Sequence, residues 1–461
     1  MKRFFAVSAL TVAMLAIAAP AHAHPLGNFT INTYDGLRVS RDRLQIDHVI
    51  DMAEIPTFQH RAEIDANQDG TISSAESSTY GTATCASAAR ALSARVDGRA
   101  LALTARQSSL SFPPGAGGLP TMRVTCSIVG VLGTGAHRIE FSDPTFGDHI
   151  GWHEITAIGD RTTLSGTDLP TQSVSARLTR YPQDLLRSPL DMRSASFSFS
   201  PGGSAAPVAG DSSAPPQTRG VDALTRAFTA LVASHRASIP FAIVAVLIAI
   251  ALGALHALAP GHGKTVMAAY VVGRRGSFKQ AALIASTVTL THTAGVVLIG
   301  VTLTLSRALA PERIYPWLGL ASGCLLIGIG ATMVRARIRA RSHLMHSHDH
   351  THASAPMSRR GLLAIGFVGG LVPSPSALVV LLGAIALGRL WFGIVLIAAY
   401  GAGMGATLAG AGLLLVHARA RLERAHARGW AVRSAAAIPI VAACVVLLLG
   451  IATAARGIAQ L

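Results

Sequence analysis

A series of long apolar segments fills the C-terminal half of the chain, and this feature most limits the folds that the sequence can adopt. The segments are 239–273, 280–305, 314–334, 361–387, 391–416 and 434–455. Most approach the length of about 20 residues that an α-helix needs to cross a bilayer. Half of all residues are hydrophobic and only 13% are charged, which is too apolar for an ordinary soluble protein. The sequence therefore predicts an α-helical polytopic membrane domain of six spans over residues 238–461.

Charged residues between the apolar segments predict how the chain is threaded through the bilayer. Three basic loops alternate with loops that carry few charges; their basic residues are Arg274, Arg275, Lys279, Arg335, Arg337, Arg339, Arg341, Arg359, Arg360, Arg419, Arg421, Arg424 and Arg428. The positive-inside rule places these loops in the cytoplasm, so six spans with both termini outside satisfy every loop. The net charge of +16 is then a topology signal, and we expect a lipid bilayer rather than a nucleic acid as partner.

The N-terminus has the three parts of a secretory signal. Lys2 and Arg3 precede an apolar stretch that is too short to span comfortably, and the small residues Ala21 and Ala23 follow in an A-x-A pattern. Residues 1–23 are therefore expected to be a signal peptide, with an uncleaved anchor as the alternative. A signal peptide places the next region outside the cytoplasm and the protein in the inner membrane. Cleavage would leave His24 first, with an amine and an imidazole that could chelate copper or nickel.

Residues 24–200 have the pattern of a β-rich domain. Short alternating runs separated by Gly, Pro and Asp predict strands at Phe29–Tyr34, Leu44–Ile50, Met122–Val129, His137–Phe141 and Ser173–Leu178. We expect an antiparallel sandwich and, because an exported domain permits oxidation, a disulfide between Cys85 and Cys126. Residues 201–237 are expected to be a low-complexity linker followed by an amphipathic segment.

A twelve-residue stretch at 65–76 matches the calcium loop of an EF-hand. Residues with oxygen donors stand at each ligand position: Asp65, Asn67, Asp69, Thr71, Ser73 and Glu76. Gly70 stands where that loop turns sharply, and helical flanks are expected at 56–64 and 74–92. Because sensors usually pair such loops, we expect a structural Ca²⁺ clip, an EF-hand-like insertion in the β-rich domain. An Asx-rich turn without metal is the alternative.

Two segments, 253–260 and 366–373, resemble each other. Each has a Gly followed by a Pro seven residues later, and each leads into Val, Leu and Ala. They open the first and fourth predicted spans, so each begins a half of three spans, and an odd number makes the halves face opposite ways. Inverted 3+3 repeats with Gly- and Pro-broken helices point to the binding site of a secondary transporter. Chance similarity between apolar segments is the alternative.

Three histidines, His256, His262 and His292, are expected at membrane depth, where ionisable groups are costly and usually functional. On an unbroken helix His262 would be rotated about 240° from His256. Pro260 and Gly261 interrupt the helix between them. We therefore expect the two imidazoles to converge, with His292 approaching from the second span.

The donor atoms near these histidines favour a borderline metal ion. Imidazole suits nickel, cobalt, copper and zinc, whereas calcium and magnesium prefer oxygen, and the sequence offers no carboxylate or thiolate nearby. Further donors are the hydroxyls of Thr291, Thr293 and Ser374 and the carbonyls freed at Pro373. Lys264 is expected to pair with freed carbonyls or to snorkel toward the cytoplasm. The alternative is that the histidines only form hydrogen bonds across helices.

A second group of histidines lies in the predicted cytoplasmic loop 335–360. Five histidines and one aspartate fall within ten residues; the histidines are His343, His346, His348, His350 and His352. His-rich tracts collect borderline metals, so the loop could buffer metal at the inner mouth of a path. An incidental polar loop is the alternative.

The energy source is expected to be an ion gradient. Gly263, Lys264 and Thr265 look like the end of a phosphate-binding loop, but that motif needs Gly where Leu258 stands. With no ATP site evident in the sequence, transport should be secondary. Because histidine binds metal only when neutral, we hypothesise proton exchange.

The residues described above resemble the NicO family of nickel/cobalt transporters, within the lysine-exporter-like superfamily. The similar parts are His256–Lys264, Thr291–Thr293, the His-rich loop and Gly369–Pro375, and the start His24–Asn28 is similar to a subgroup with an exported N-terminal domain. The resemblance implies nickel or cobalt as substrate and favours efflux. Family relatives often have Cys where this chain has Ser374. Disulfide-reducing electron carriers of the same superfamily need cysteines at the helix breaks, where this chain has His262 and Ser374.

The sequence thus predicts a secondary transporter for Ni²⁺ or Co²⁺ and not an enzyme. The rival hypothesis is a membrane-anchored protein that binds or senses metal or calcium without transport. Helix breaks at Pro260–Gly261 and at Pro373 favour the transporter, because an anchor does not need them. Transport direction, the choice of metal and a homo-oligomeric state stay open.

Overall fold

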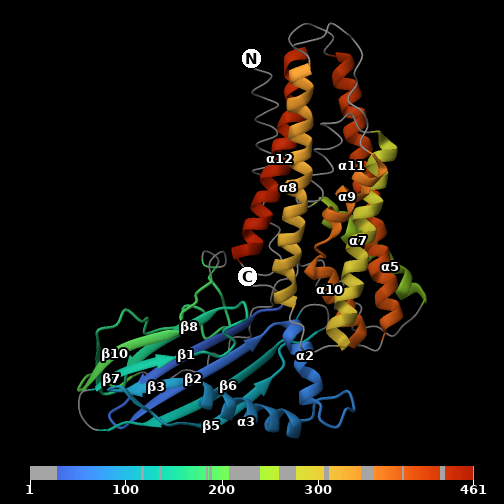
Figure 1. Cartoon of the computed structure of the whole chain (residues 1–461). Coiled ribbons are helices and arrows are strands. Elements are labelled where there is room, and N and C mark those ends of the chain that lie inside the picture. The colour runs from blue at the N-terminus through green and yellow to red at the C-terminus, as the bar shows by residue number, and fades with distance from the viewer. Residues whose placement is uncertain are drawn as a thin grey trace. The chain divides into compact units, whose positions relative to one another are not determined.

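Two compact units make up the part of the chain that can be described. The computed structural model describes residues 28–115, 119–133, 137–182, 185, 189–206, 239–258, 277–305, 311–343, 358–386, 389–425 and 431–459. We call the unit within residues 28–206 the N-terminal domain and the unit within residues 239–459 the membrane domain. The first is built on strands and the second is helical (Figure 1).

Two five-stranded sheets form the N-terminal domain. The first has the order β5 (Leu103–Ser111), β6 (Met122–Val131), β2 (Arg43–Met52), β1 (Ile31–Val39) and β8 (His153–Gly159). The second has the order β4 (Arg99–Ala100), β3 (Ser93–Val96), β7 (His137–Ser142), β10 (Ser194–Pro201) and β9 (Thr162–Ser165). Neighbouring strands are antiparallel except β1 and β8, which are parallel. The β-rich character agrees with the sequence, whereas the expectation of purely antiparallel pairing is wrong at β8.

One hydrophobic core is shared by the two sheets. Along β6 every second residue from Met122 is buried, as expected for a strand with one face on a core. Leu37 and Ile46 of the first sheet belong to the same buried cluster as Phe141 and Phe197 of the second. Burial between the sheets therefore fixes which face of each strand is apolar.

The strand predicted at Ser173–Leu178 is absent, and the segment is a turn. Ala176, Arg177 and Leu178 have φ between 49° and 64°, the left-handed region. Side chains take the amides that a strand would use: the Ser173 hydroxyl accepts from the Arg177 amide, and the Ser175 hydroxyl accepts from the Leu178 amide. Alternation of apolar and polar residues predicts a strand only when the backbone amides are available to a neighbouring strand. Here the hydroxyls of the same segment accept hydrogen bonds from those amides.

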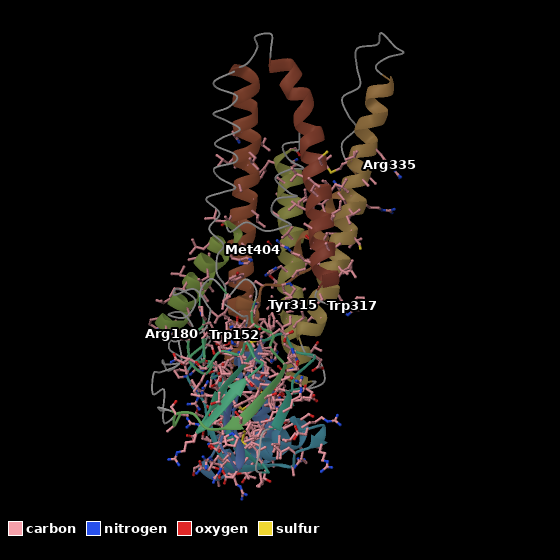
Figure 2. The ribbon with its side chains drawn as sticks, turned by 90° about the vertical axis from the view of Figure 1, so that its left-hand side faces the viewer. Trp152, Arg180, Tyr315, Trp317, Arg335 and Met404 are labelled. Carbon is pink, nitrogen blue, oxygen red and sulfur yellow. A yellow bond between two sulfur atoms is a disulfide. The ribbon has the colours of Figure 1, made fainter. Side chains whose placement is uncertain are left out.

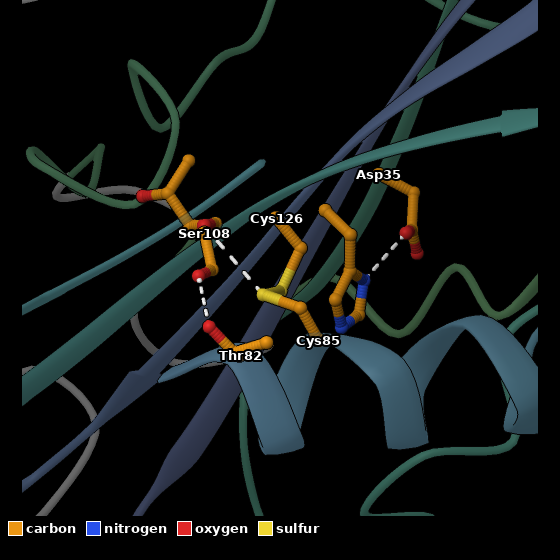
Figure 3. Close-up of a disulfide and its surroundings, with 7 residues drawn as sticks. Asp35, Thr82, Cys85, Ser108 and Cys126 are labelled. Carbon is orange, nitrogen blue, oxygen red and sulfur yellow. Dashed lines mark hydrogen bonds and ion pairs between the residues drawn. A yellow bond between two sulfur atoms is a disulfide. The ribbon is translucent and has the colours of Figure 1, made fainter. Parts of the chain in front are cut away.

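A helical pair interrupts the strands between β2 and β3. Helix α2 covers Glu54–Ile64 and α3 covers Ser74–Ala91. Helix α3 begins with a capping box, in which Ser73 and Glu76 each accept a hydrogen bond from the other's backbone amide. The Cys85–Cys126 disulfide joins α3 to β6 (Figure 3).

The membrane domain contains seven described helices. They are α5 (Ile239–Leu258), α7 (Phe278–Leu305), α8 (Pro311–His343), α9 (Arg359–Gly370), α10 (Pro375–Ala386), α11 (Leu390–Ala425) and α12 (Ala431–Ala459). Four stretches are long and apolar enough to cross a bilayer, namely Ile239–Leu258, Phe278–Thr304, Ile314–Arg335 and Leu390–His417. The described residues thus have the helices of a multi-pass membrane protein.

The fourth apolar segment is broken into two short helices. Helix α9 ends at Gly370 and α10 begins at Pro375. Pro373 and Pro375 have no amide hydrogen to continue a helical ladder, and a proline disfavours helical conformation in the residue before it. Ser374 therefore lies in the connection between the two helices, and it is 6% exposed.

Small residues let the membrane helices approach closely. Helix α8 packs along α12 in antiparallel fashion, because a Cβ on Gly323 would meet Ala454 and a Cβ on Gly330 would meet Leu447. The other main pairs are α5 with α11, α7 with α9 and α7 with α11. Such contacts replace the hydrophobic drive that is missing between helices in lipid. Figure 2 shows Met404, which is 1% exposed, on α11 of this bundle.

Candidate metal site in the membrane domain

Four polar side chains from separate helical elements meet inside the membrane domain. His256 lies in the last described turn of α5, His292 in the middle of α7, and Ser374 between α9 and α10. Tyr400 lies on α11. The imidazole of His256 is 5.8 Å, between ring centroids, from the imidazole of His292 and also from the ring of Tyr400. His256 is thus the middle member of the group.

The broken segment fixes the orientation of His292. The backbone amide of Ser374 donates to Nε2 of His292 at 3.3 Å, and the Ser374 hydroxyl oxygen lies 3.2 Å from the same nitrogen. Because an amide only donates, Nε2 acts as the acceptor and the ring proton is on Nδ1. The imidazole is then neutral, which is the form that binds metal ions.

Glycines bring the backbones around the site close together. A Cβ on Gly253 would overlap the carbonyl oxygen of Tyr400, and a Cβ on Gly403 would overlap the carbonyl oxygen of Ile250. Both pairs join α5 to α11 within two turns of His256. The distance between His256 and Tyr400 therefore depends on residues without side chains.

Two predicted threonine ligands lie nearby but have other contacts. The hydroxyl of Thr291 donates to the carbonyl of Thr287 at 2.8 Å, within α7. The hydroxyl of Thr293 faces α11, where a Cβ on Gly401 would lie 2.5 Å from it. Pro373 packs against Gly295, at 3.7 Å from a Cβ placed there. Thr291 and Thr293 thus flank His292 without a hydrogen bond to it in the described structure.

The two imidazoles lie almost close enough to bind one ion. A metal–nitrogen bond of about 2.1 Å puts a ring centroid about 3.2 Å from the metal, so two rings on one tetrahedral ion have centroids about 5.2 Å apart. The observed separation is 5.8 Å, so a shared ion would draw the two rings slightly closer together. Two imidazoles with hydroxyls beside them form a donor set for nickel, cobalt, copper or zinc rather than for calcium or magnesium.

Several residues singled out in the sequence lie outside the described residues. Pro260, Gly261, His262 and Lys264 are among them, so the predicted convergence of His262 on His256 stays a prediction. In the His-rich loop, His343 is the last residue of α8, and His346, His348, His350 and His352 are not described. The predicted signal peptide at 1–23, His24 and residues 207–238 are also outside.

The twelve-residue loop of the N-terminal domain closes on its own carboxylates. The Asp65 carboxylate accepts from the amides of Asp69 and Gly70, at 3.1 and 2.9 Å. Glu76, from α3, reaches back and accepts from the Ala66 amide at 2.9 Å. Gly70 has φ 82°, a conformation that favours glycine. The first and last predicted ligands are therefore held at the same end of the loop.

The remaining predicted ligands of this loop are tied to one another. Asn67 donates to Asp69 at 3.0 Å, and the Thr71 amide and hydroxyl both donate to Asp69. Hydrogen bonds from Thr71 lower the pKa of the Asp69 carboxyl, and hydrogen bonds from Ser73 lower the pKa of the Glu76 carboxyl. Both groups are therefore ionised acceptors at neutral pH.

Tyr400 is the member of the membrane site that the sequence analysis missed. It is 8% exposed and stands in an apolar segment between small residues, in the run Ala399-Tyr400-Gly401. A tyrosine whose neighbours are all small can place its polar end against another helix. That local pattern is the signal that could have found it.

Comparison with known proteins gives consistent matches for this chain. The NicO family, described as a high-affinity nickel-transport protein, matches residues 242–361. The provisionally named nickel/cobalt efflux system MJ1092 of Methanocaldococcus jannaschii is 30% identical over 210 residues, which are 45% of this chain and 91% of that protein. The nickel/cobalt efflux system RcnA of Escherichia coli K12 is 31% identical over 207 residues, 36% of this chain and 76% of RcnA. No solved structure matches.

The family match lies within the membrane domain and spans both His256 and His292. Each of these relatives is covered over more than two thirds of its own length. Their shared description concerns ion transport and no chemical conversion of a substrate, so the protein is not an enzyme. The chain belongs to the NicO family of nickel/cobalt transporters.

Proposed function

We propose that the protein is a secondary transporter that moves nickel or cobalt ions out of the cytoplasm across the inner membrane. The observation that carries the proposal is the meeting of His256 and His292, from α5 and α7, with Ser374 at the break of α9 and α10. A site made by several helices at a broken segment can open to either side of the membrane by small movements of those helices. The efflux direction is the one in the names of the relatives.

The proposed architecture is six spans in an inverted 3+3 repeat. Its halves are α5, α7 and α8, and then the α9–α10 pair, α11 and α12. In this repeat α5 corresponds to the α9–α10 pair, α7 to α11, and α8 to α12. The main helix contacts support it, because each has a counterpart under this correspondence: the α5–α11 contact corresponds to the contact of the α9–α10 pair with α7, and the α7–α11 and α8–α12 contacts correspond to themselves. Inverted repeats predict such a symmetric set of neighbours.

The ends of α8 support a span of bilayer length. Trp317 is 61% exposed near one end of the apolar stretch, and Arg335 closes the other end (Figure 2). Eighteen residues of helix extend about 27 Å, close to the hydrocarbon thickness of a bilayer. Tryptophan at one boundary and arginine at the other are typical anchors. Arg335 then lies on the cytoplasmic side, and the N-terminal domain lies outside.

Other predicted residues complete the proposed path. His262 would add a third imidazole. The ion would bind Nε2 of His292 in place of the hydrogen bonds from Ser374, and the Ser374 hydroxyl would then lie beside the ion. Thr291 and Thr293 would flank this ion. The His-rich loop, from His343 to His352, would collect metal at the cytoplasmic mouth. Export would exchange the ion for protons, because each imidazole must be neutral to bind it.

Nickel tolerance of cells that lack their own exporter tests the proposal. Wild-type protein should lower cellular nickel and allow growth at higher nickel, and His292→Ala should lose both effects. His417→Ala is the matched control, because His417 is an exposed histidine of α11 whose imidazole hydrogen-bonds the carbonyl of Leu413 on the same helix. Equal activity of the His292 variant and the control would refute the site. A rise of cellular nickel with wild-type protein would refute the direction.

We also propose that the loop 65–76 binds one Ca²⁺ as a structural clip of the N-terminal domain. The support is the closed loop geometry, with Asp65 and Glu76 at one end and ionised Asp69 between them. Calorimetric titration of the full chain with Ca²⁺ should show one site that is lost in Glu76→Gln. The control is Glu63→Gln, which removes an exposed carboxylate of α2 from outside the loop. Absence of Ca²⁺ binding, or equal binding by both variants, would refute the clip.

A further inference from the structure

A second group of metal-ligand side chains lies in the core of the N-terminal domain. Asp35 of β1 and His48 of β2 are opposite each other in the strand register, and Asp143 follows β7 of the other sheet. One oxygen from each carboxylate and a nitrogen of His48 all lie within 4.8 Å of one another. The three residues are 0–3% exposed.

This cluster contains more acceptors than the described structure can satisfy. Nδ1 of His48 pairs with Oδ1 of Asp35 at 2.8 Å, and Oδ1 of Asp143 accepts from the Thr145 amide at 2.8 Å. The second oxygen of Asp143 and Nε2 of His48 have no partner among the described atoms, although both are buried. Unpartnered polar atoms in a core are costly and usually indicate an ion or a water molecule between them.

The charges of the cluster are also unbalanced. Neither Asp35 nor Asp143 has an ion pair with Arg or Lys among the described residues, and Asp35 has only His48. Two buried carboxylates this close need a cation, which can be a metal ion or the protonated imidazole of His48, or a shared proton. A protonated His48 or a shared proton would balance one negative charge, but either would leave Nε2 of His48 without a partner among the described atoms.

We propose that Asp35, His48 and Asp143 form a buried site for one divalent transition-metal ion of the zinc, cobalt and nickel class. Two carboxylates balance the ion's charge, and a mixed oxygen–nitrogen donor set suits this class. Calcium would need six to eight oxygens, which this core does not offer among its described residues. All three residues belong to the N-terminal domain.

The place of the site suggests a structural role. His48 is opposite Cys126 in the register of β2 with β6, and Cys126 forms the disulfide with Cys85 of α3; Figure 3 shows Asp35 near this disulfide. An ion here would link β1, β2 and the end of β7, so it would join the two sheets at the centre of the core. Because the residues are enclosed, the ion would enter while the domain folds and leave slowly.

Metal retention by the full chain tests the site. Protein is made in cells supplied with cobalt, purified in detergent, treated briefly with EDTA and desalted, and its metals are measured by mass spectrometry. Exposed histidines give up their metal to EDTA, so we expect about one equivalent in wild type and near zero in His48→Gln and Asp143→Asn. Asp42→Asn, an exposed position on the same domain, should retain the full equivalent. Equal retention by all four proteins, or none in wild type, would overturn the proposal.

A second measurement distinguishes lost metal from failed folding and from a shared proton. Thiol labelling shows whether the Cys85–Cys126 disulfide has formed, and proteolysis at rising temperature follows the stability of the domain. With a metal site, Asp143→Asn forms the disulfide but unfolds at lower temperature and no longer responds to cobalt. With a shared proton only, the side-chain amide that Asp143→Asn introduces donates to Asp35, so the variant unfolds at higher temperature than wild type; this outcome would overturn the proposal.

Discussion

Replacement of Gly403 by alanine tests whether close packing of α5 on α11 sets the geometry of the membrane site. A Cβ at this position would overlap the carbonyl oxygen of Ile250. The two helices would have to separate by more than about 1 Å before the contact reached an ordinary van der Waals distance. His256 lies on α5 and its neighbour Tyr400 lies on α11, so the same movement separates their rings.

The magnitude follows from two opposing effects. Overpacking of a tight contact costs about 1–3 kcal/mol, and alanine in place of glycine in a helix contributes about 1 kcal/mol in the other direction. Gly410→Ala is the matched control, because Gly410 is also on α11 and a Cβ there meets nothing within 4 Å. The gain in helix propensity is common to both variants, so Gly403→Ala should be less stable than Gly410→Ala by about 1–3 kcal/mol.

Two assays measure the outcome. Unfolding of purified protein in mixed detergent micelles gives the stability difference, and nickel accumulation in cells gives the activity. A loss of about 1.4 kcal/mol in ion binding corresponds to a tenfold weaker site, and we expect nickel export to fall by about that factor in Gly403→Ala alone. If Gly403→Ala were as stable and as active as Gly410→Ala, the packing would not determine the site.

Three further predictions concern single groups. Tyr400→Phe keeps the ring beside His256 and removes the hydroxyl, so we expect the bundle to unfold as in wild type while nickel export falls several-fold in the cell assay; unchanged export would exclude Tyr400 from the site. Loss of the disulfide in Cys85→Ala/Cys126→Ala should destabilise the N-terminal domain by about 4 kcal/mol, which is the entropy that a 41-residue loop removes from the unfolded chain. The urea dependence of proteolysis measures this loss, and a loss below about 1 kcal/mol would contradict the entropic explanation. Burial, and then Arg193, lowers the pKa of His153 to about 4 from 6.5. As pH falls, the unfolded chain therefore binds a proton at this histidine before the folded protein does. The contribution of neutral His153 to the free energy of unfolding is up to about 3 kcal/mol; it is complete above pH 6.5 and is lost between pH 6.5 and 4. In His153→Gln the pH dependence of stability over this window should be flatter, and an identical slope would contradict the prediction.

The described helices of the membrane domain follow the predicted apolar segments because long apolar runs have few alternatives, and four of these stretches are long and apolar enough to cross a bilayer. The broken segment at Pro373 was also foreseeable, since two prolines flanking Ser374 cannot continue a helix. Contacts between segments distant along the chain were not foreseeable in detail. The hydrogen bond from Ser374 to His292 depends on how α7 packs against α9 and α10, which no local pattern encodes.

The N-terminal domain shows the limits of local patterns more clearly. Its loop 65–76 could be compared with a calcium-binding pattern because the ligand positions of that pattern are fixed within twelve residues, and calcium binding there stays a prediction. Asp35, His48 and Asp143 come together only through the register of β1 with β2 and the approach of the second sheet, so their cluster was not found. The turn at Ser173–Leu178 was mistaken for a strand because hydroxyl groups that capture backbone amides do not change the alternation of residue types.

The parallel pairing of β1 with β8 has a consequence for the order of events during biosynthesis. The first described strand cannot complete its pairing in the sheet until the chain has been made as far as Gly159. The ten described strands end by Pro201, whereas the first described membrane helix begins at Ile239. All of these strands are therefore available before that helix leaves the ribosome, and the N-terminal domain can fold before the helical bundle is complete.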